Sequence, residues 1–173
     1  MRINKLFLTF STLFILSLLG IACTNDKANP DGNTDQELYD MAKPTTGFTW
    51  YKNDDVLLNK SAGSGHNQPF LRTRYNGIAA ALLDNEGKVK AGTIFPDGSL
   101  IVKELRDNAT SVAIYAVLYK QAGHPDADAD GWVWGYVDTG GSPLFPASSK
   151  GNSCRGCHSQ SENIDFTLMN KYF

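Results

Sequence analysis

The segment Cys154-Arg155-Gly156-Cys157-His158 constrains this chain more than any other, because it places two thiols and an imidazole in C-x-x-C-H spacing. At that spacing each thiol can bond to one vinyl group of a porphyrin, and the histidine that follows can reach the iron as an axial ligand. The motif predicts one covalently bound haem c per chain, held by Cys154 and Cys157, with His158 as the iron ligand.

Two other uses of the cysteine pair remain open at this stage. A zinc site needs four ligands, and beyond the motif the chain offers only His66 and His124, which are not closely spaced. A redox dithiol usually opens a helix directly after a strand in a βαβ pattern, and the sequence shows no such pattern. The spacing therefore favours haem over both.

The first 22 residues have the pattern of an export signal. Arg2 and Lys5 form a short basic region, residues 6–20 are almost wholly apolar, and residues 20–22 (GIA) give the small-x-small ending of a cleavage site. An apolar core of this length is shorter than the roughly 20 residues of a membrane-spanning helix. We expect residues 1–22 to be removed on export, which agrees with haem attachment outside the bacterial cytoplasm.

Cys23 follows the expected cleavage site directly, as in the lipobox of bacterial lipoproteins. The usual large aliphatic residue three places before that cysteine is Gly20 here, so simple cleavage without lipid is the alternative. An acylated Cys23 would hold the protein on a membrane surface through its lipid chains. We expect a lipoprotein anchored to a bacterial membrane and facing the periplasm.

Charge and composition then bound the mature chain. Without Arg2 and Lys5 it carries 14 basic and 18 acidic residues, a net charge of −4, which disfavours nucleic-acid binding. Residues 23–36 are polar and rich in Asn, Asp, Pro and Gly, so we expect a lipidated terminus and a flexible tether there. The remaining 37–173 are enough for one domain to bury its own core without a structural disulfide.

The middle of the chain predicts an antiparallel sheet. Short β-prone runs alternate with turn sequences such as DNEG at 84–87 and PDGS at 96–99, and tight turns between successive runs favour antiparallel neighbours. We expect a mainly β, α+β domain with a few short helices, one of them at 35–41, and a loop at 59–68. The expected strands are 78–83, 89–95, 100–105, 111–120 and 132–137. In the fourth, Tyr115 and Tyr119 would face away from Ile114, and we expect haem or a second subunit to cover them.

The sixth position of the iron has weak candidates. Only 15 residues follow His158, too few to return a ligand around the porphyrin with much freedom. Met169 lies in that segment and is better explained as a core residue, and the remaining candidates sit upstream in the chain. We therefore expect an open or weakly filled sixth site, with Met41, His66 and His124 as the alternatives.

Charged residues elsewhere allow two interpretations each. Lys103 interrupts an apolar strand face, as a sheet-edge lysine with its ammonium in water or as a group aimed at the haem. Arg72 and Arg74 share one side of an extended segment, either as partners of the haem propionates or as a solvated face. The acidic run DADAD at 126–130 resembles the start of a calcium loop, but the closing acid is missing, which favours a turn.

Five segments in order resemble the cytochrome P-460 family, which includes cytochrome c′-beta: 92–98 (GTIFPDG), 101–104 (IVKE), 132–136 (WVWGY), 154–158 (CRGCH) and 165–167 (DFT). The resemblance covers close to half of the chain, from residue 92 to its end. It implies a mostly antiparallel β domain, a homodimer, and one c-type haem with His158 as proximal ligand.

The resemblance also implies two activities. Cytochromes P-460 oxidise hydroxylamine with a haem cross-linked to a lysine and pass the electrons to an outside cytochrome. Cytochrome c′-beta lacks the cross-link and binds nitric oxide or carbon monoxide at an apolar site. Lys103 is the candidate cross-linking and catalytic residue, with Lys88 and Lys90 as alternatives, and no distal carboxylate stands out. We expect redox chemistry on a small nitrogen species, or, as the alternative, gas binding or electron transfer without turnover.

Overall fold

One antiparallel sheet organises the chain in the computed structural model, which describes residues 33–173. Its seven strands have the order β1-β3-β4-β5-β6-β7, with β2 also paired to β3. The strands are β1 (Phe48–Trp50), β2 (Leu58–Asn59), β3 (Phe70–Asn76), β4 (Leu100–Arg106), β5 (Val112–Lys120), β6 (Trp132–Asp138) and β7 (Pro143–Phe145). The helices are α1 (Thr34–Ala42), α2 (Gly77–Ala80), α3 (Arg155–His158) and α4 (Met169–Tyr172), with short 3₁₀ turns at Tyr51–Asn53 and Ala147–Ser149. The predicted mainly β fold is confirmed.

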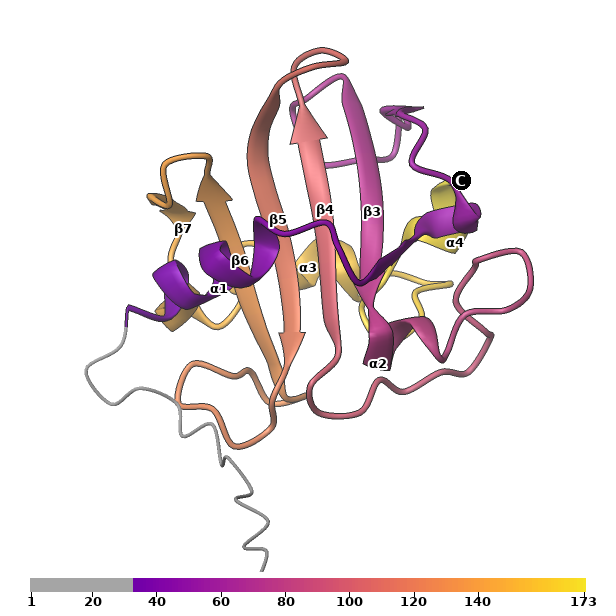
Figure 1. Cartoon of the computed structure of the whole chain (residues 1–173). Helices are drawn as coiled ribbons and strands as arrows, with labels where there is room; N and C mark the ends of the chain where they lie inside the picture. Colours follow the sequence, from indigo (N-terminus) through magenta and orange to yellow (C-terminus); the bar gives the residue numbers. More distant parts are fainter. Residues whose placement is uncertain (1–32) are drawn as a thin grey trace, which may run out of the picture.

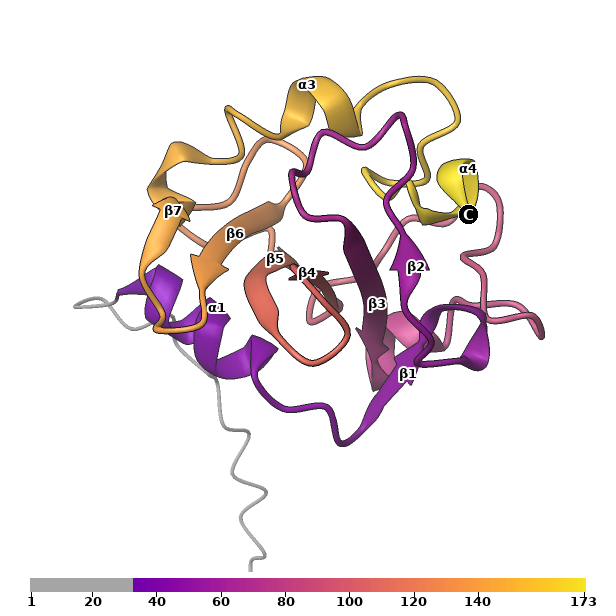
Figure 2. The same ribbon diagram turned by 90° about the horizontal axis from the view of Figure 1, so that it is seen from above.

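The two faces of the sheet are covered by different parts of the chain. Helix α1 lies across one face, and the C-terminal segment that carries α3 lies against the other (Figure 1). The view from above shows the same separation, with the segment between β2 and β3 rising toward α3 (Figure 2). None of the helices in the described range is long and apolar enough to cross a membrane.

Strand register decides which side chains face α3. Lys103 pairs with Thr73 on one side and with Ala116 on the other, and Ala116 pairs with Tyr136. These four residues therefore form one row across β3, β4, β5 and β6, because residues directly opposite one another in an antiparallel sheet point to the same face. The neighbouring row on this face consists of Tyr75, Ile101, Leu118 and Trp134.

Helix α1 packs where the sequence predicted a helix. Asn33 caps it, because its side chain accepts a hydrogen bond from the backbone of Gln36 at 3.3 Å. The helix thus begins inside the predicted tether of residues 23–36. Its Leu38 is buried, and Tyr39 lies 6.2 Å from Tyr115 between ring centres. The expectation that haem or a second subunit covers Tyr115 is therefore wrong, because α1 covers it.

Two of the five expected strands are absent from the described residues. In the 78–83 segment the side chain of Asn76 accepts from Ala79 N at 3.0 Å and caps α2 instead. In the 89–95 segment only Val89 pairs as a strand residue would, in an isolated β-bridge with Leu83. Gly92 adopts a positive φ of 72°. The apolar residues of these two segments suggested strands. Local hydrogen bonds of side chains and backbone instead fold both segments into turns. The expected strands at 100–105, 111–120 and 132–137 are confirmed as β4, β5 and β6.

A buried charge cluster lies on the α1 side of the sheet. Glu104 accepts from Arg72 Nε at 2.7 Å and from Arg106 Nε at 2.8 Å, and it pairs with Arg74. Arg74 also stacks its guanidinium over Trp50 at 5.3 Å. Arg72 and Arg74 are therefore neither propionate partners nor a solvated face, because they point away from α3 and bind a buried carboxylate.

Candidate functional site

The C-x-x-C-H segment forms the single turn of α3, with Cys154 at its N-cap. Both thiols are free, Cys154 half-buried and Cys157 exposed. The exposure of Cys157 leaves its sulfur reachable for a covalent bond. The third cysteine, Cys23, and the predicted export signal lie outside the described residues.

The ring of His158 is held in a defined orientation. Its Nδ1–H donates to the carbonyl of Phe166 at 2.7 Å, and since a carbonyl can only accept, the proton must sit on Nδ1. Nε2 then carries the free lone pair, the state a metal-binding histidine needs. Trp134 packs edge-on against the ring at 5.2 Å between centres. Burial, with a smaller contribution from Lys103, lowers the pKa of His158 to about 4, so the imidazole is neutral at neutral pH.

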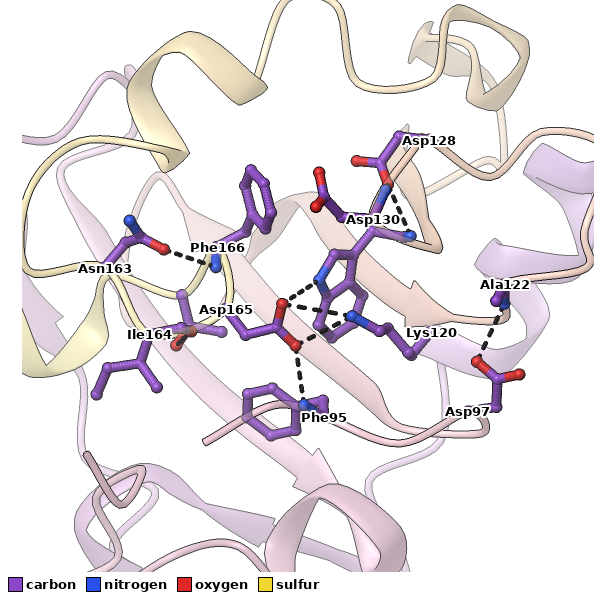
Figure 3. Close-up of polar contacts among 12 residues, drawn as sticks. Phe95, Asp97, Lys120, Ala122, Asp128, Asp130, Asn163, Ile164, Asp165 and Phe166 are labelled. Carbon is purple, nitrogen blue, oxygen red and sulfur yellow. Dashed lines mark hydrogen bonds and ion pairs between the residues drawn. The ribbon is translucent and has the colours of Figure 1, made fainter. Parts of the chain in front are cut away.

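Asp165 fixes the backbone that holds His158. Its buried carboxylate accepts from Phe95 N at 2.8 Å, from Trp132 Nε1 at 3.2 Å and from Lys120 Nζ at 3.1 Å (Figure 3). Asp165 and Phe166 both adopt left-handed backbone conformations, with φ of 44° and 66°. Such conformations cost side-chain-bearing residues about 1–3 kcal/mol each, so they persist where surrounding contacts enforce them. Asp165 is thus a positioning residue that presents the Phe166 carbonyl to His158.

We expect Asp165→Asn to lower the free energy of unfolding by about 1–3 kcal/mol, because the ammonium of Lys120 loses its charged partner. In the haem protein that the motif predicts, it should also raise the reduction potential, since a looser hydrogen bond at Nδ1 makes the imidazole of His158 a weaker donor. Urea titration and potentiometry measure the two effects. The matched control is Asp97→Asn, which removes one exposed turn contact to Ala122 N and should leave the potential unchanged. An unchanged potential in Asp165→Asn would refute the positioning role.

Arg155, inside the motif, ties α3 to the acidic run at 126–130. Its guanidinium donates to Asp128 and, at 2.6 Å, to Asp130. Asp128 also accepts from Trp134 Nε1 at 2.7 Å, and although burial alone would raise its pKa, these bonds hold that pKa below its usual value. Asp126 instead accepts from the hydroxyl of Thr34 at 2.7 Å.

The three carboxylates of the acidic run therefore do not converge as calcium ligands. Within residues 33–173 no three His, Cys, Asp or Glu side chains gather as they would around an ion. The zinc and calcium alternatives gain no support from this part of the chain. The run is a turn, as the missing closing acid indicated, and its added role is to anchor the motif through Arg155.

A hollow lies between α3 and the sheet, directly beside the motif. Two adjoining cavities occupy it, and the surface that lines both is mostly apolar. The six residues that line both are His66, Lys103, Tyr136, Cys154, His158 and Leu168. This arrangement fits a haem: both thiols and the oriented imidazole open onto one largely apolar space.

Lys103 projects into this cavity from the middle of the sheet. Strand β4 lies between β3 and β5, so the interpretation of Lys103 as a sheet-edge lysine is wrong. Its ammonium has no hydrogen-bond or ion-pair partner within residues 33–173, and burial lowers its pKa to about 8. Of the competing lysines, Lys88 pairs with Glu86 at 3.1 Å and Lys90 is exposed, and neither lines the cavity.

The candidates for the sixth iron position lie in different parts of the fold. Met41 belongs to α1 and packs on the opposite face of the sheet, and His124 is buried in a turn where its Nδ1 accepts from Asp126 N at 3.0 Å. Met169 is a core residue, as expected, and its sulfur accepts from the hydroxyl of Thr73 at 3.2 Å. His66 lines the cavity, where burial and the nearby Lys103 lower its pKa to about 3.

The chain matches no protein-family model, no curated protein and no solved structure. Its relationship to the cytochrome P-460 family therefore stays a prediction, carried by the five sequence segments.

Proposed function

We propose that the protein is an exported mono-haem c-type cytochrome that acts on a small nitrogen species such as hydroxylamine or nitric oxide. Cys154 and Cys157 would attach one haem, and His158 would bind its iron. The observation that carries the proposal is the cavity beside both thiols, which His158 lines while its Nδ1 is bound to Phe166 O and its Nε2 is left for a metal.

Different residues around the cavity would orient His158, hold the motif in place and exclude water. Phe166 and Asp165 keep the proton of His158 on Nδ1, while Arg155 holds the motif against the sheet. Leu168 adds an apolar wall that limits the access of water. The haem supplies an iron that changes oxidation state and binds a small ligand at its sixth position.

The role of Lys103 decides whether the proposed haem protein is an enzyme or only binds its ligand. We expect Lys103→Met to remove any lysine–haem cross-link and to lower hydroxylamine oxidation by about a hundredfold or more, the scale on which a positioned catalytic group acts. Peptide mass spectrometry and reduction of an external acceptor measure the two effects. Lys90→Met is the control, because that side chain lies outside the cavity. A rate that survives Lys103→Met would remove this lysine from the mechanism.

A second function, gas binding or electron transfer without turnover, is favoured by one observation. The lining of both cavities, as far as the described residues form it, contains no Asp or Glu. Hydroxylamine oxidation releases protons, and a carboxylate at the distal site is the group expected to take them up. An apolar lining suits a neutral diatomic ligand such as nitric oxide or carbon monoxide.

The partners follow from the same proposal. An outside cytochrome would accept electrons, and the family resemblance implies a homodimer. A lipid on Cys23 would keep the domain at the periplasmic side of a bacterial membrane, with residues 24–32 between the lipid and the domain.

Optical spectroscopy of the purified protein tests the proposal. The protein should be made in a host that matures c-type cytochromes and then assayed as the pyridine haemochrome for one haem per chain. The ferrous spectrum should change on addition of nitric oxide. Hydroxylamine-dependent reduction of an acceptor would favour the enzyme, and its absence with retained nitric oxide binding would favour the gas-binding protein. No covalent haem would refute both.

A further inference from the structure

His66 lies opposite His158 in the cavity, although 92 positions separate the two along the chain. Their ring centres are 6.4 Å apart, and the planes meet at 73°. Both imidazoles line both adjoining hollows. The segment that carries His66 rises toward α3 (Figure 2), and a Cβ added at Gly65 would stand 3.9 Å from the sulfur of Cys157.

Each of the two rings has one nitrogen turned to the protein and one left free. Nδ1 of His158 donates to Phe166 O, and Nδ1 of His66 lies 3.5 Å from the hydroxyl of Tyr136. Tyr136 also stacks against the His66 ring, 5.8 Å between centres and 9° from parallel. No partner for either Nε2 occurs within residues 33–173. Tyr136 therefore contacts His66 through both its ring and its hydroxyl.

The separation of the rings distinguishes two roles for His66. Imidazole nitrogens bind metals at about 2 Å, so two imidazoles on opposite sides of one iron place their ring centres roughly 6 Å apart. A histidine that instead hydrogen-bonds to a ligand already on the iron stands roughly 2–3 Å farther away, because the hydrogen bond replaces the direct contact. The observed 6.4 Å matches direct coordination.

We propose that Nε2 of His66 is the second axial ligand of the haem iron in the resting protein, opposite Nε2 of His158. This inference rests on the covalent haem proposed above. It makes the sixth site weakly filled, since an entering nitrogen ligand must replace the bond from iron to His66. The exchange moves no electrons: the lone pair of the entering ligand takes the place of the imidazole lone pair.

The chain around His66 is suited to such an exchange. The stretch before His66 is rich in glycine and serine: Ser61, Gly63, Ser64 and Gly65. Its hydrogen bonds are local, because they join residues two or three positions apart. A segment held by local contacts can move without disturbing the sheet. Electron transfer needs no such movement, because two histidine ligands can stay bound in both oxidation states.

Spectra of the ferric holoprotein test the proposal. We expect a low-spin, six-coordinate spectrum by electron paramagnetic resonance and optical absorption in the wild type. His66→Ala should convert it to a high-spin spectrum, and added imidazole should restore the low-spin form. His124→Ala is the matched control, because that imidazole lies outside the cavity, and it should keep the wild-type spectrum.

Ligand binding gives a second, independent readout. Because only molecules with His66 detached can bind nitric oxide, His66→Ala should bind it about tenfold faster or more. A wild-type protein that carries covalent haem but is high-spin would overturn the role of His66 and leave the haem proposal intact. A low-spin His66→Ala without added imidazole would also overturn it. A wild-type chain without covalent haem would overturn both proposals.

Discussion

Replacing Cys154 and Cys157 together by alanine will abolish covalent attachment of haem. In the proposed haem protein each thiol would supply one thioether bond, and the described residues contain no other cysteine that could replace them. The porphyrin should then be extracted completely by acidified organic solvent, and the intact mass should be that of the polypeptide alone. Either single variant should keep one bond and give a lower yield of attached haem.

The control for this prediction changes the flanks of the motif instead of its thiols. Ser153→Ala with Ser159→Ala alters two neighbouring side chains and leaves both sulfurs in place, so full haem attachment is expected. Haem that resists extraction from the double-cysteine variant would show that the C-x-x-C-H segment is not the attachment site. Loss of haem from the serine control would show that the assay reports folding.

Glu104→Ala will cause the largest loss of stability, about 3–5 kcal/mol, because it leaves buried guanidinium groups without a counter-charge. Arg74 is fully buried and Glu104 is 2% exposed, so water cannot replace the missing carboxylate. Arg72 and Arg106 would lose the same partner. Chemical denaturation followed by circular dichroism measures the change, with Glu104→Gln expected to be milder because an acceptor oxygen remains.

An exposed ion pair provides the comparison for Glu104. Glu86 is 75% exposed and pairs with Lys88 at 3.1 Å, so Glu86→Ala should cost roughly 0–1 kcal/mol. The haem content per folded Glu104 variant should stay at the wild-type level, because the charge cluster faces α1 and not the cavity. Equal effects of Glu104→Ala and Glu86→Ala would mean that the cluster does not stabilise the fold.

The sequence predicted those strands whose position depends on neighbouring residues in the chain. Alternating apolar residues bounded by turn sequences identified β4, β5 and β6, and the same alternation placed Lys103 among apolar side chains. Strand β3 was missed, because Arg72 and Arg74 look like surface residues until Glu104 is known to lie opposite them. Burial of charge by partners distant in sequence leaves no periodic signal.

The candidate site shows the same division. The spacing of the motif alone predicted a haem-binding role for Cys154, Cys157 and His158, and the structure places all three at one cavity. Asp165 contacts Phe95 across 70 positions, and His66 lies beside His158 across 92 positions. Nothing near either residue in the sequence indicates these contacts, although His66 was one of the three alternatives for the sixth iron position. The opposite charges of Arg155 and the acidic run at 126–130 were a usable signal for the anchor of α3.

The intact mass of the wild-type protein, isolated from a host that matures cytochromes, shows whether the chain carries covalent haem. We predict the mass of the mature polypeptide with its acyl groups plus one haem, retained after denaturation because Cys154 and Cys157 would hold it covalently. A mass equal to the amino acids and acyl groups alone would refute covalent haem and every role proposed for the cavity.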